Sequence, residues 1–121
     1  MEDLKLKIEL EVTLTQEDVD DIMGTALDGG IGYWCRKAEV VGGEYFGEYA
    51  SDQISRGGSL MLYDDDGKYE LTLEKFTEAM KKVIAEGGLT IEEGRIDAGE
   101  IDAIIADTIV QIAVFGEVVY C

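Results

Sequence analysis

The sequence DLKLKIELEVTL, residues 3–14, alternates apolar and polar side chains with a period of two. Every even-numbered position holds leucine, isoleucine or valine, and every odd-numbered position holds a charged residue or threonine. Successive side chains of a strand point to opposite faces, so this pattern predicts a long strand with one buried and one solvated face. We expect this strand to belong to the sheet of the protein.

Two later segments have the spacing of amphipathic helices. Residues 16–27 follow Thr15, a favoured N-cap residue, and Asp18 stands three positions after it. Residues 73–86 follow Thr72, and a pair of glycines comes next. Each segment repeats apolar residues every three to four positions, which predicts a helix with one buried face.

A third helix is predicted over about residues 98–115, with Asp97 and Glu100 as its capping box. This helix is apolar around most of its girth. Such a helix is central in the core or buried against another subunit, and we therefore expect a homo-oligomer, most simply a symmetric dimer.

The remaining regular elements are expected to be short strands. An Asp65-Asp66-Gly67 turn predicts a hairpin between the second and third of them. The expected strands cover residues 31–41, 59–64, 68–72 and 117–120, and an ordered loop covers 44–59. The chain is thus predicted to be one α+β domain over residues 1–121. Its sheet should be mostly antiparallel, with four to five strands packed against two to three helices.

The composition excludes several classes of function. The chain has no histidine, so Ser-His-Asp triads, Cys-His dyads and His-ligated metal sites are ruled out. With 27 acidic and 10 basic side chains its net charge is −17, which disfavours direct contact with nucleic acid or an anionic membrane. We expect no catalysis, no cofactor and no bound metal. The acidic side chains either keep the protein soluble or form a face that docks on a basic groove of another protein.

The two cysteines, Cys35 and Cys121, form neither a CxxC motif nor a disulfide framework. They are expected to be reduced thiols of a cytoplasmic protein, although a bridge between them stays open. No basic region followed by an apolar stretch opens the sequence, which agrees with that location.

Cations, aromatic rings and glycines gather between residues 31 and 59, which predicts a ligand site inside an otherwise acidic molecule. Arg56 stands in the turn Ser55-Arg56-Gly57-Gly58-Ser59, where backbone N–H groups could cradle phosphate. Aromatic side chains could stack a base, with burial in the core as the alternative for Trp34. The predicted ligand-binding residues are Trp34, Arg36, Tyr45, Tyr49, Gln53, Arg56, Gly57 and Gly58.

A second candidate site is a protein interface on the acidic faces of the first and third helices. Four aspartates, Asp18, Asp20, Asp21 and Asp28, would form part of it. Such a face would suit an inhibitor that imitates the phosphates of DNA and docks on a nucleic-acid enzyme.

Several long segments also resemble a family of small acidic proteins encoded by phages and prophages of Firmicutes. They are VTLTQEDVDDIMGTALDGGIGYWCRKAEVVG (12–42), GEYASDQISRGGSLMLYD (47–64), KYELTLEKF (68–76) and IDAIIADTIVQIAVFGEVVY (101–120). The resemblance implies a phage protein acting in the host bacterial cytosol, with Tyr33 beside the residues of the predicted pocket.

Three functions follow from that resemblance and stay open at this point. The first is a non-catalytic protein that counters host immunity by sequestering a small nucleotide-derived signal. The second is an acidic inhibitor, of DNA-mimic or anti-CRISPR type, of a host nucleic-acid enzyme. The third is a structural or accessory phage protein.

Overall fold

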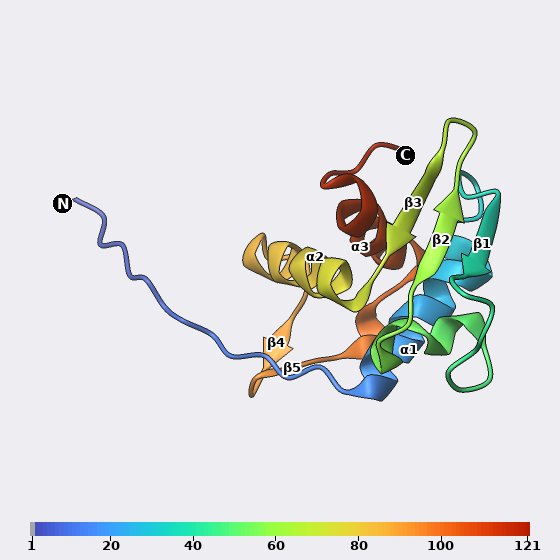
Figure 1. Cartoon of the computed structure of the whole chain (residues 1–121). Coiled ribbons are helices and arrows are strands. Elements are labelled where there is room, and N and C mark those ends of the chain that lie inside the picture. The colour runs from blue at the N-terminus through green and yellow to red at the C-terminus, as the bar shows by residue number, and fades with distance from the viewer. Residues whose placement is uncertain (1) are drawn as a thin grey trace.

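The computed structural model describes residues 2–121 and has an α+β fold. Three α-helices pack beside a three-stranded antiparallel sheet, and two further strands form a separate hairpin (Figure 1). The helices are α1 (Gln16–Thr25), α2 (Leu73–Ala85) and α3 (Ala103–Phe115). The sheet runs β1 (Lys37–Val40), β2 (Leu60–Tyr63), β3 (Lys68–Leu71), and the hairpin pairs β4 (Ile91–Glu92) with β5 (Arg95–Ile96).

The fold class is confirmed, but the sheet has fewer strands than the four to five predicted. The hairpin of β2 and β3 forms where expected, with Leu60 opposite Leu71. At its turn the Asp64 carboxylate accepts hydrogen bonds from the N–H groups of Asp66 and Gly67. The strand predicted over residues 31–41 is shorter and occupies Lys37–Val40, because the chain turns immediately before it.

The first two helices confirm their predicted caps. The Thr15 hydroxyl accepts from the Asp18 N–H at 3.0 Å, and the Asp18 carboxylate accepts from the Thr15 N–H at 2.9 Å. Helix α1 then continues into a π-helical turn, η1 (Ala26–Gly30). Helix α2 is capped by the hydroxyl of Thr72.

The capping box predicted for the third helix is wrong. Asp97 accepts instead from the N–H of Gly99 in a short 3-10 turn, η4 (Ala98–Glu100), and Glu100 accepts from the N–H of Thr90. The side chain of Asp102 is the N-cap, so α3 begins only at Ala103.

The core lies between the sheet and the three helices. Helix α3 packs on α2 and beside β3. Most of its apolar girth packs within the chain, since Ala106, Ile109 and Val110 are fully buried, but Ile104 is 75% exposed. Two more 3-10 turns, η2 (Ala50–Asp52) and η3 (Ile54–Arg56), join the β1–β2 connection to α1. Across residues 2–121, no helix is long and apolar enough to cross a membrane.

The strand predicted over residues 3–14 does not form. Thr13 makes one isolated parallel bridge to Arg95, and its N–H donates to the Gly94 carbonyl at 2.8 Å. Residues 2–12, here called the N-terminal arm, run away from the body of the molecule (Figure 1). The arm therefore joins neither sheet, although its alternation suits a strand.

The strand predicted over residues 117–120 is also wrong. That stretch has no strand partner among the described residues, because the buried amide of Gln111 bonds its backbone instead. The Gln111 carbonyl accepts from the N–H groups of Val119 and Tyr120, each at 2.8 Å. Cys35 and Cys121 are both free thiols.

Candidate functional site

The structure divides the predicted ligand-binding residues into two groups. Tyr45, Tyr49 and the stretch from Gln53 to Gly58 come together in the connection between β1 and β2, beside α1. Trp34 and Arg36 precede β1 and contact the C-terminal part of the chain and the β2–β3 turn. A single pocket built from all eight residues is therefore absent from residues 2–121.

Trp34 belongs to the core, as its alternative interpretation held. It is 2% exposed, and its indole N–H donates to the Asp107 carboxylate at 2.7 Å. Its ring stacks parallel to that of Tyr120 with 5.4 Å between centroids. No face of the indole is left for a ligand to stack on.

The two arginines of the predicted site are each paired with carboxylates. Arg36 makes a two-pronged bond to Asp65, at 3.0 and 3.3 Å, and this contact raises the pKa of the arginine and lowers that of Asp65. Arg56 lies 3.1 Å from the carboxylate of Asp20 and 3.8 Å from that of Asp52. Each guanidinium therefore already has a carboxylate partner.

Residues 44–49 of this region form an exposed segment, which we call the aromatic loop. Its rings are solvent-exposed: Tyr45 is 56% exposed, Phe46 51% and Tyr49 62%. Glu44 and Glu48, both exposed, alternate with them. Large exposed rings beside carboxylates are surface chemistry suited to a protein partner, because aromatic residues are enriched where interfaces bury most surface.

A buried amide holds the aromatic loop from below. Gln53 is fully buried; its carbonyl accepts from the Phe46 N–H at 2.9 Å, and its NH₂ donates to the carbonyls of Phe46 and Tyr49, both at 2.7 Å. The three bonds fix the backbone of the aromatic loop at Phe46 and at Tyr49. Gln53 is thus a supporting residue and has no open polar atom to offer a ligand.

Asp52 fixes the same loop from its C-terminal side. Its carboxylate accepts from the N–H groups of Tyr49 and Glu48, both at 2.9 Å, and these bonds lower the pKa of Asp52. Gly47 has a φ of +69°, and a Cβ there would lie 3.0 Å from Asp52. The loop therefore needs glycine at this position both for its backbone conformation and for space.

The predicted glycine turn supports the loop as well. A Cβ on Gly58 would lie 3.0 Å from the Phe46 ring, so the ring packs directly on the backbone. Gly57 follows η3 as its C-cap and has a φ of +87°. This is a left-handed conformation, which glycine adopts without strain. The N–H groups of Gly57 and Gly58 donate to the carbonyls of Ile54 and Gln53, at 3.1 and 2.9 Å, so both are already used within the turn.

The acidic face predicted on the first helix is only partly available. Asp18 is 8% exposed, caps α1 and lies 3.5 Å from Arg95. Asp20 is bound to Arg56 and to the Ser55 hydroxyl, which donates to it at 2.6 Å. Asp21 and Asp28 are exposed. The four aspartates therefore do not present one free carboxylate surface.

A buried polar network that the sequence analysis missed lies against α3. Asp107 accepts from Trp34 and, at 2.6 Å, from the hydroxyl of Tyr33; Gln111 donates to it at 2.9 Å. Burial and the bond to Asp107 raise the pKa of Tyr33 to about 12. The signal was available in the sequence: Asp107 and Gln111 are one turn apart in a helix whose other residues, apart from Thr108, are apolar.

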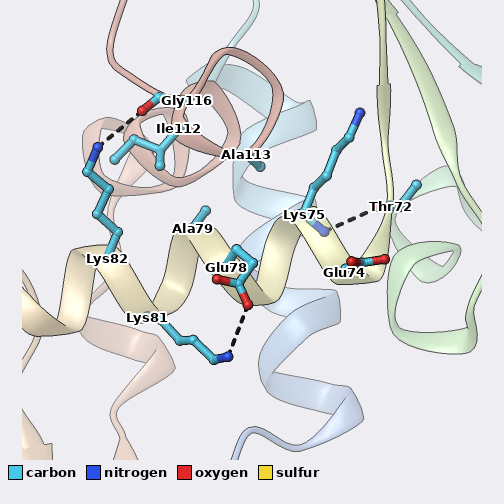
Figure 2. Close-up of a pocket in the computed structure, with 10 residues that line it drawn as sticks. All are labelled: Thr72, Glu74, Lys75, Glu78, Ala79, Lys81, Lys82, Ile112, Ala113 and Gly116. Carbon is cyan, nitrogen blue, oxygen red and sulfur yellow. Dashed lines mark hydrogen bonds and ion pairs between the residues drawn. The ribbon is translucent and has the colours of Figure 1, made fainter.

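A surface hollow of about 760 Å³ lies between α2 and the C-terminal end of α3 (Figure 2). Its lysines are engaged: Lys81 pairs with Glu78 at 3.0 Å, and Lys82 donates to the Gly116 carbonyl at 3.1 Å. Lys75 lies farther along α2, near Thr72 (Figure 2), and its Nζ donates to the Glu70 carbonyl at 2.8 Å. The hollow has no converging set of free polar groups.

Comparisons with family models, curated proteins and solved structures found no match to this chain. Among residues 2–121, no group of three or more carboxylate or thiol side chains is placed to hold a metal ion. The aromatic loop is consequently the candidate site that the geometry supports best.

Proposed function

We propose that this chain is a non-catalytic binding protein that docks on a basic surface of another protein through the aromatic loop. The observation that carries the proposal is a set of three exposed rings on a backbone segment fixed by Gln53 and Asp52. A segment that is already ordered loses little conformational entropy on binding. Large rings on such a segment are the residues that commonly supply most of the binding energy at an interface.

The charge of the molecule supports a basic partner. The net charge is −17, and all three arginines of the chain lie against an aspartate: Arg36 on Asp65, Arg56 on Asp20 and Arg95 on Asp18. The field around the protein is therefore negative. Such a field accelerates encounters with a positive surface and slows encounters with an anion.

Sequestration of a nucleotide-derived signal receives less support from these contacts. Phosphate would have to displace carboxylates from Arg36 and Arg56, and a base would have to displace Tyr120 from Trp34. The resemblance to phage proteins is retained as part of the proposal. It makes a host nucleic-acid enzyme with a basic groove the first partner to test.

The test is quantitative affinity capture from a Firmicute lysate at low salt, followed by titration of the purified partner. Wild type is compared with a Tyr45→Ala/Tyr49→Ala variant, which removes two displayed rings. The matched control is Ile104→Ala/Val118→Ala, because these side chains are 75% and 48% exposed but lie elsewhere. We expect the loop variant to bind at least about tenfold more weakly, and the control to bind like wild type.

Three results would overturn the proposal. Two of them are a basic partner that binds the loop variant and wild type equally, and no captured partner at all. The third is heat released in calorimetric titration of wild type with cyclic nucleotides or cyclic ADP-ribose isomers, which would favour sequestration. Binding that weakens as salt rises is expected, since steering by surface charge is screened.

A further inference from the structure

We propose that the N-terminal arm pairs antiparallel with the arm of a second copy of this chain, about a two-fold axis at Ile8. This inference concerns a different surface from the aromatic loop and does not depend on the function proposed above. It commits to one partner, an identical arm, and to one register.

The first observation is the exposure of the arm's apolar face. Leu4 is 89% exposed, Leu6 82%, Ile8 81% and Leu10 58%. At the root of the arm the same face is partly buried, because Val12 and Leu14 pack against the core. The apolar face that is partly buried at Val12 and Leu14 therefore continues into solvent along the arm. Exposure of four large apolar residues at alternate positions of one strand face is unusual.

The backbone of the arm has a free edge. Thr13 uses its N–H on the side that faces β5, where it donates to Gly94. Backbone groups of successive residues in a strand point to opposite edges, so the even-numbered residues present the other edge. No element among residues 2–121 pairs with that edge.

The charges of the arm are self-complementary in one register. With Ile8 opposite Ile8 of the second copy, Lys7 lies opposite Glu9 and Lys5 lies opposite Glu11. By symmetry each pair occurs twice, which gives four pairs of opposite charge on one face of the two-stranded ribbon. Directly opposed charges of opposite sign stabilise a strand pair, and like charges destabilise it.

Other registers lack this match. A parallel, in-register pair would place Lys5 opposite Lys5 and Glu9 opposite Glu9. An antiparallel pair centred on Lys7 would oppose that lysine to itself and Asp3 to Glu11. The order of charges thus selects the register about Ile8.

The apolar face is completed in the same register. Leu6 lies opposite Leu10 of the second copy, and Leu4 lies opposite Val12. A two-stranded ribbon alone is marginal in water, but a groove of about 770 Å³ lies where the arm leaves the body, between Ile8, Leu10 and Val12 of the arm and Met80 and Ile84 of α2. The distal end of the second arm is brought to this groove.

The dimer expected from the third helix consequently has a different candidate interface. The large apolar residues of α3 are buried or half-buried except Ile104, which is 75% exposed. The arm instead exposes four large apolar residues at alternate positions of one face.

The experiment compares two charge-swapped chains of identical composition. Lys5→Glu/Glu11→Lys exchanges the members of one predicted pair, so all four opposite-charge pairs are preserved. Lys5→Glu/Glu9→Lys instead places a glutamate opposite Glu11 and a lysine opposite Lys7, so like charges meet in every pair. Sedimentation equilibrium and light scattering in about 0.15 M salt, where repulsion between the acidic bodies is screened beyond about 8 Å, give the dimer dissociation constants.

We expect wild type to form a dimer of twice the 13.3 kDa chain mass. The pair-preserving variant should dimerise within about threefold of wild type, and the pair-breaking variant at least about tenfold more weakly. The three substituted positions are exposed, so the body should fold alike in every chain, which circular dichroism checks. An Ile8→Ser chain should also lose dimer.

Three results would overturn the inference. A wild-type chain that stays monomeric at high concentration shows that the arms do not pair. A dimer that tolerates both charge swaps equally uses another surface. A dimer lost equally in both variants does not have the register about Ile8.

Discussion

Two buried glutamines, Gln53 and Gln111, have the same role in two different parts of the fold. Each is fully buried, and each bonds the backbone of a nearby segment through both its carbonyl and its NH₂ group. A buried amide with all partners present costs little and rigidifies what it holds, whereas one left unpaired is expensive. One glutamine orders the aromatic loop, and the other orders residues 119–120.

The C-terminal segment should be released in alkali. The bond to Asp64 raises the pKa of Tyr120 to about 12, and burial together with Asp107 raises that of Tyr33 to about 12. An unfolded tyrosine titrates near 10. The neutral phenols therefore contribute stability that is complete below about pH 10 and is lost as the pH rises through about 12.

Absorbance titration of the phenolate band measures the ionisation of these tyrosines, and near-UV circular dichroism shows whether the tertiary structure is retained. We expect Asp64→Asn to move one late-titrating tyrosine toward pH 10. Asp28→Asn, an exposed aspartate elsewhere, should leave the titration unchanged. Identical titration curves for Asp64→Asn and wild type would contradict the assigned contact.

At the scale of elements, the N-terminal arm shows what a period of two does and does not specify. The alternation of Leu4, Leu6 and Ile8 with charged residues indicates an extended backbone with two unlike faces. It does not identify the strand or surface that covers the apolar face. The neighbouring strand β5 has only two residues, Arg95–Ile96, and it pairs with Thr13 through a single bridge. The prediction of a sheet strand was therefore wrong because the segment has no long strand beside it, which its own sequence could not indicate.

The third helix illustrates a choice between two competing caps. Asp97 and Asp102 are both residue types favoured at an N-cap. Asp97 was predicted to be the cap because Glu100 follows it by three positions, whereas Ile105 stands at that place after Asp102. In the structure Ile101 is 5% exposed and has extended backbone angles. Burial of this side chain interrupts the helical path, so Asp102 caps α3. A tertiary contact decided the boundary, and local propensity could not predict it.

The candidate site was predictable in position but not in role. Tyr45, Tyr49 and Arg56 were expected to act together, and they do lie in one connection between β1 and β2. The partner that occupies Arg56 is Asp20, 36 positions away on α1, and no local pattern in the sequence indicates it. Trp34 was assigned to the site because it adjoins two cations, yet its side chain packs inward.

The π-helical turn after α1 should tolerate a methyl group at one glycine and reject it at the next. A Cβ on Gly30 would lie 2.8 Å from the Ala103 carbonyl and 3.4 Å from that of Thr25, whereas a Cβ on Gly29 meets nothing within 4 Å. We expect Gly30→Ala to lower the free energy of unfolding by about 1–3 kcal/mol, because rigid backbone must move. Gly29→Ala should stay within about 0.5 kcal/mol.

Urea denaturation of both variants measures the two free energies. The absence of a side chain at Gly30 lets the turn η1, which follows α1, pack closely against the start of α3. Equal stability of the two alanine variants would mean that the approach does not constrain the fold.

At the scale of the whole molecule, the body and the arm should be separable. Residues 2–10 lie outside the regular elements, and the packed apolar positions begin at Val12. A chain without residues 2–10 should unfold cooperatively, with a melting temperature that is constant within about 2 °C across protein concentrations.

The full chain should behave differently if two arms pair. Its melting temperature should rise with protein concentration, because mass action stabilises an associated state. Differential scanning calorimetry over a hundredfold concentration range compares the two chains. A shortened chain that fails to fold would show that the arm contributes to the body.

The setting of Trp34 gives the protein a built-in optical reporter. It is the single tryptophan of the chain, and its indole is stacked on Tyr120 while its N–H is bonded to Asp107. Its emission therefore depends on residues 107 and 120 being in place. Opening of the C-terminal segment will shift the fluorescence to longer wavelength, so the state of that segment can be followed in solution without a label.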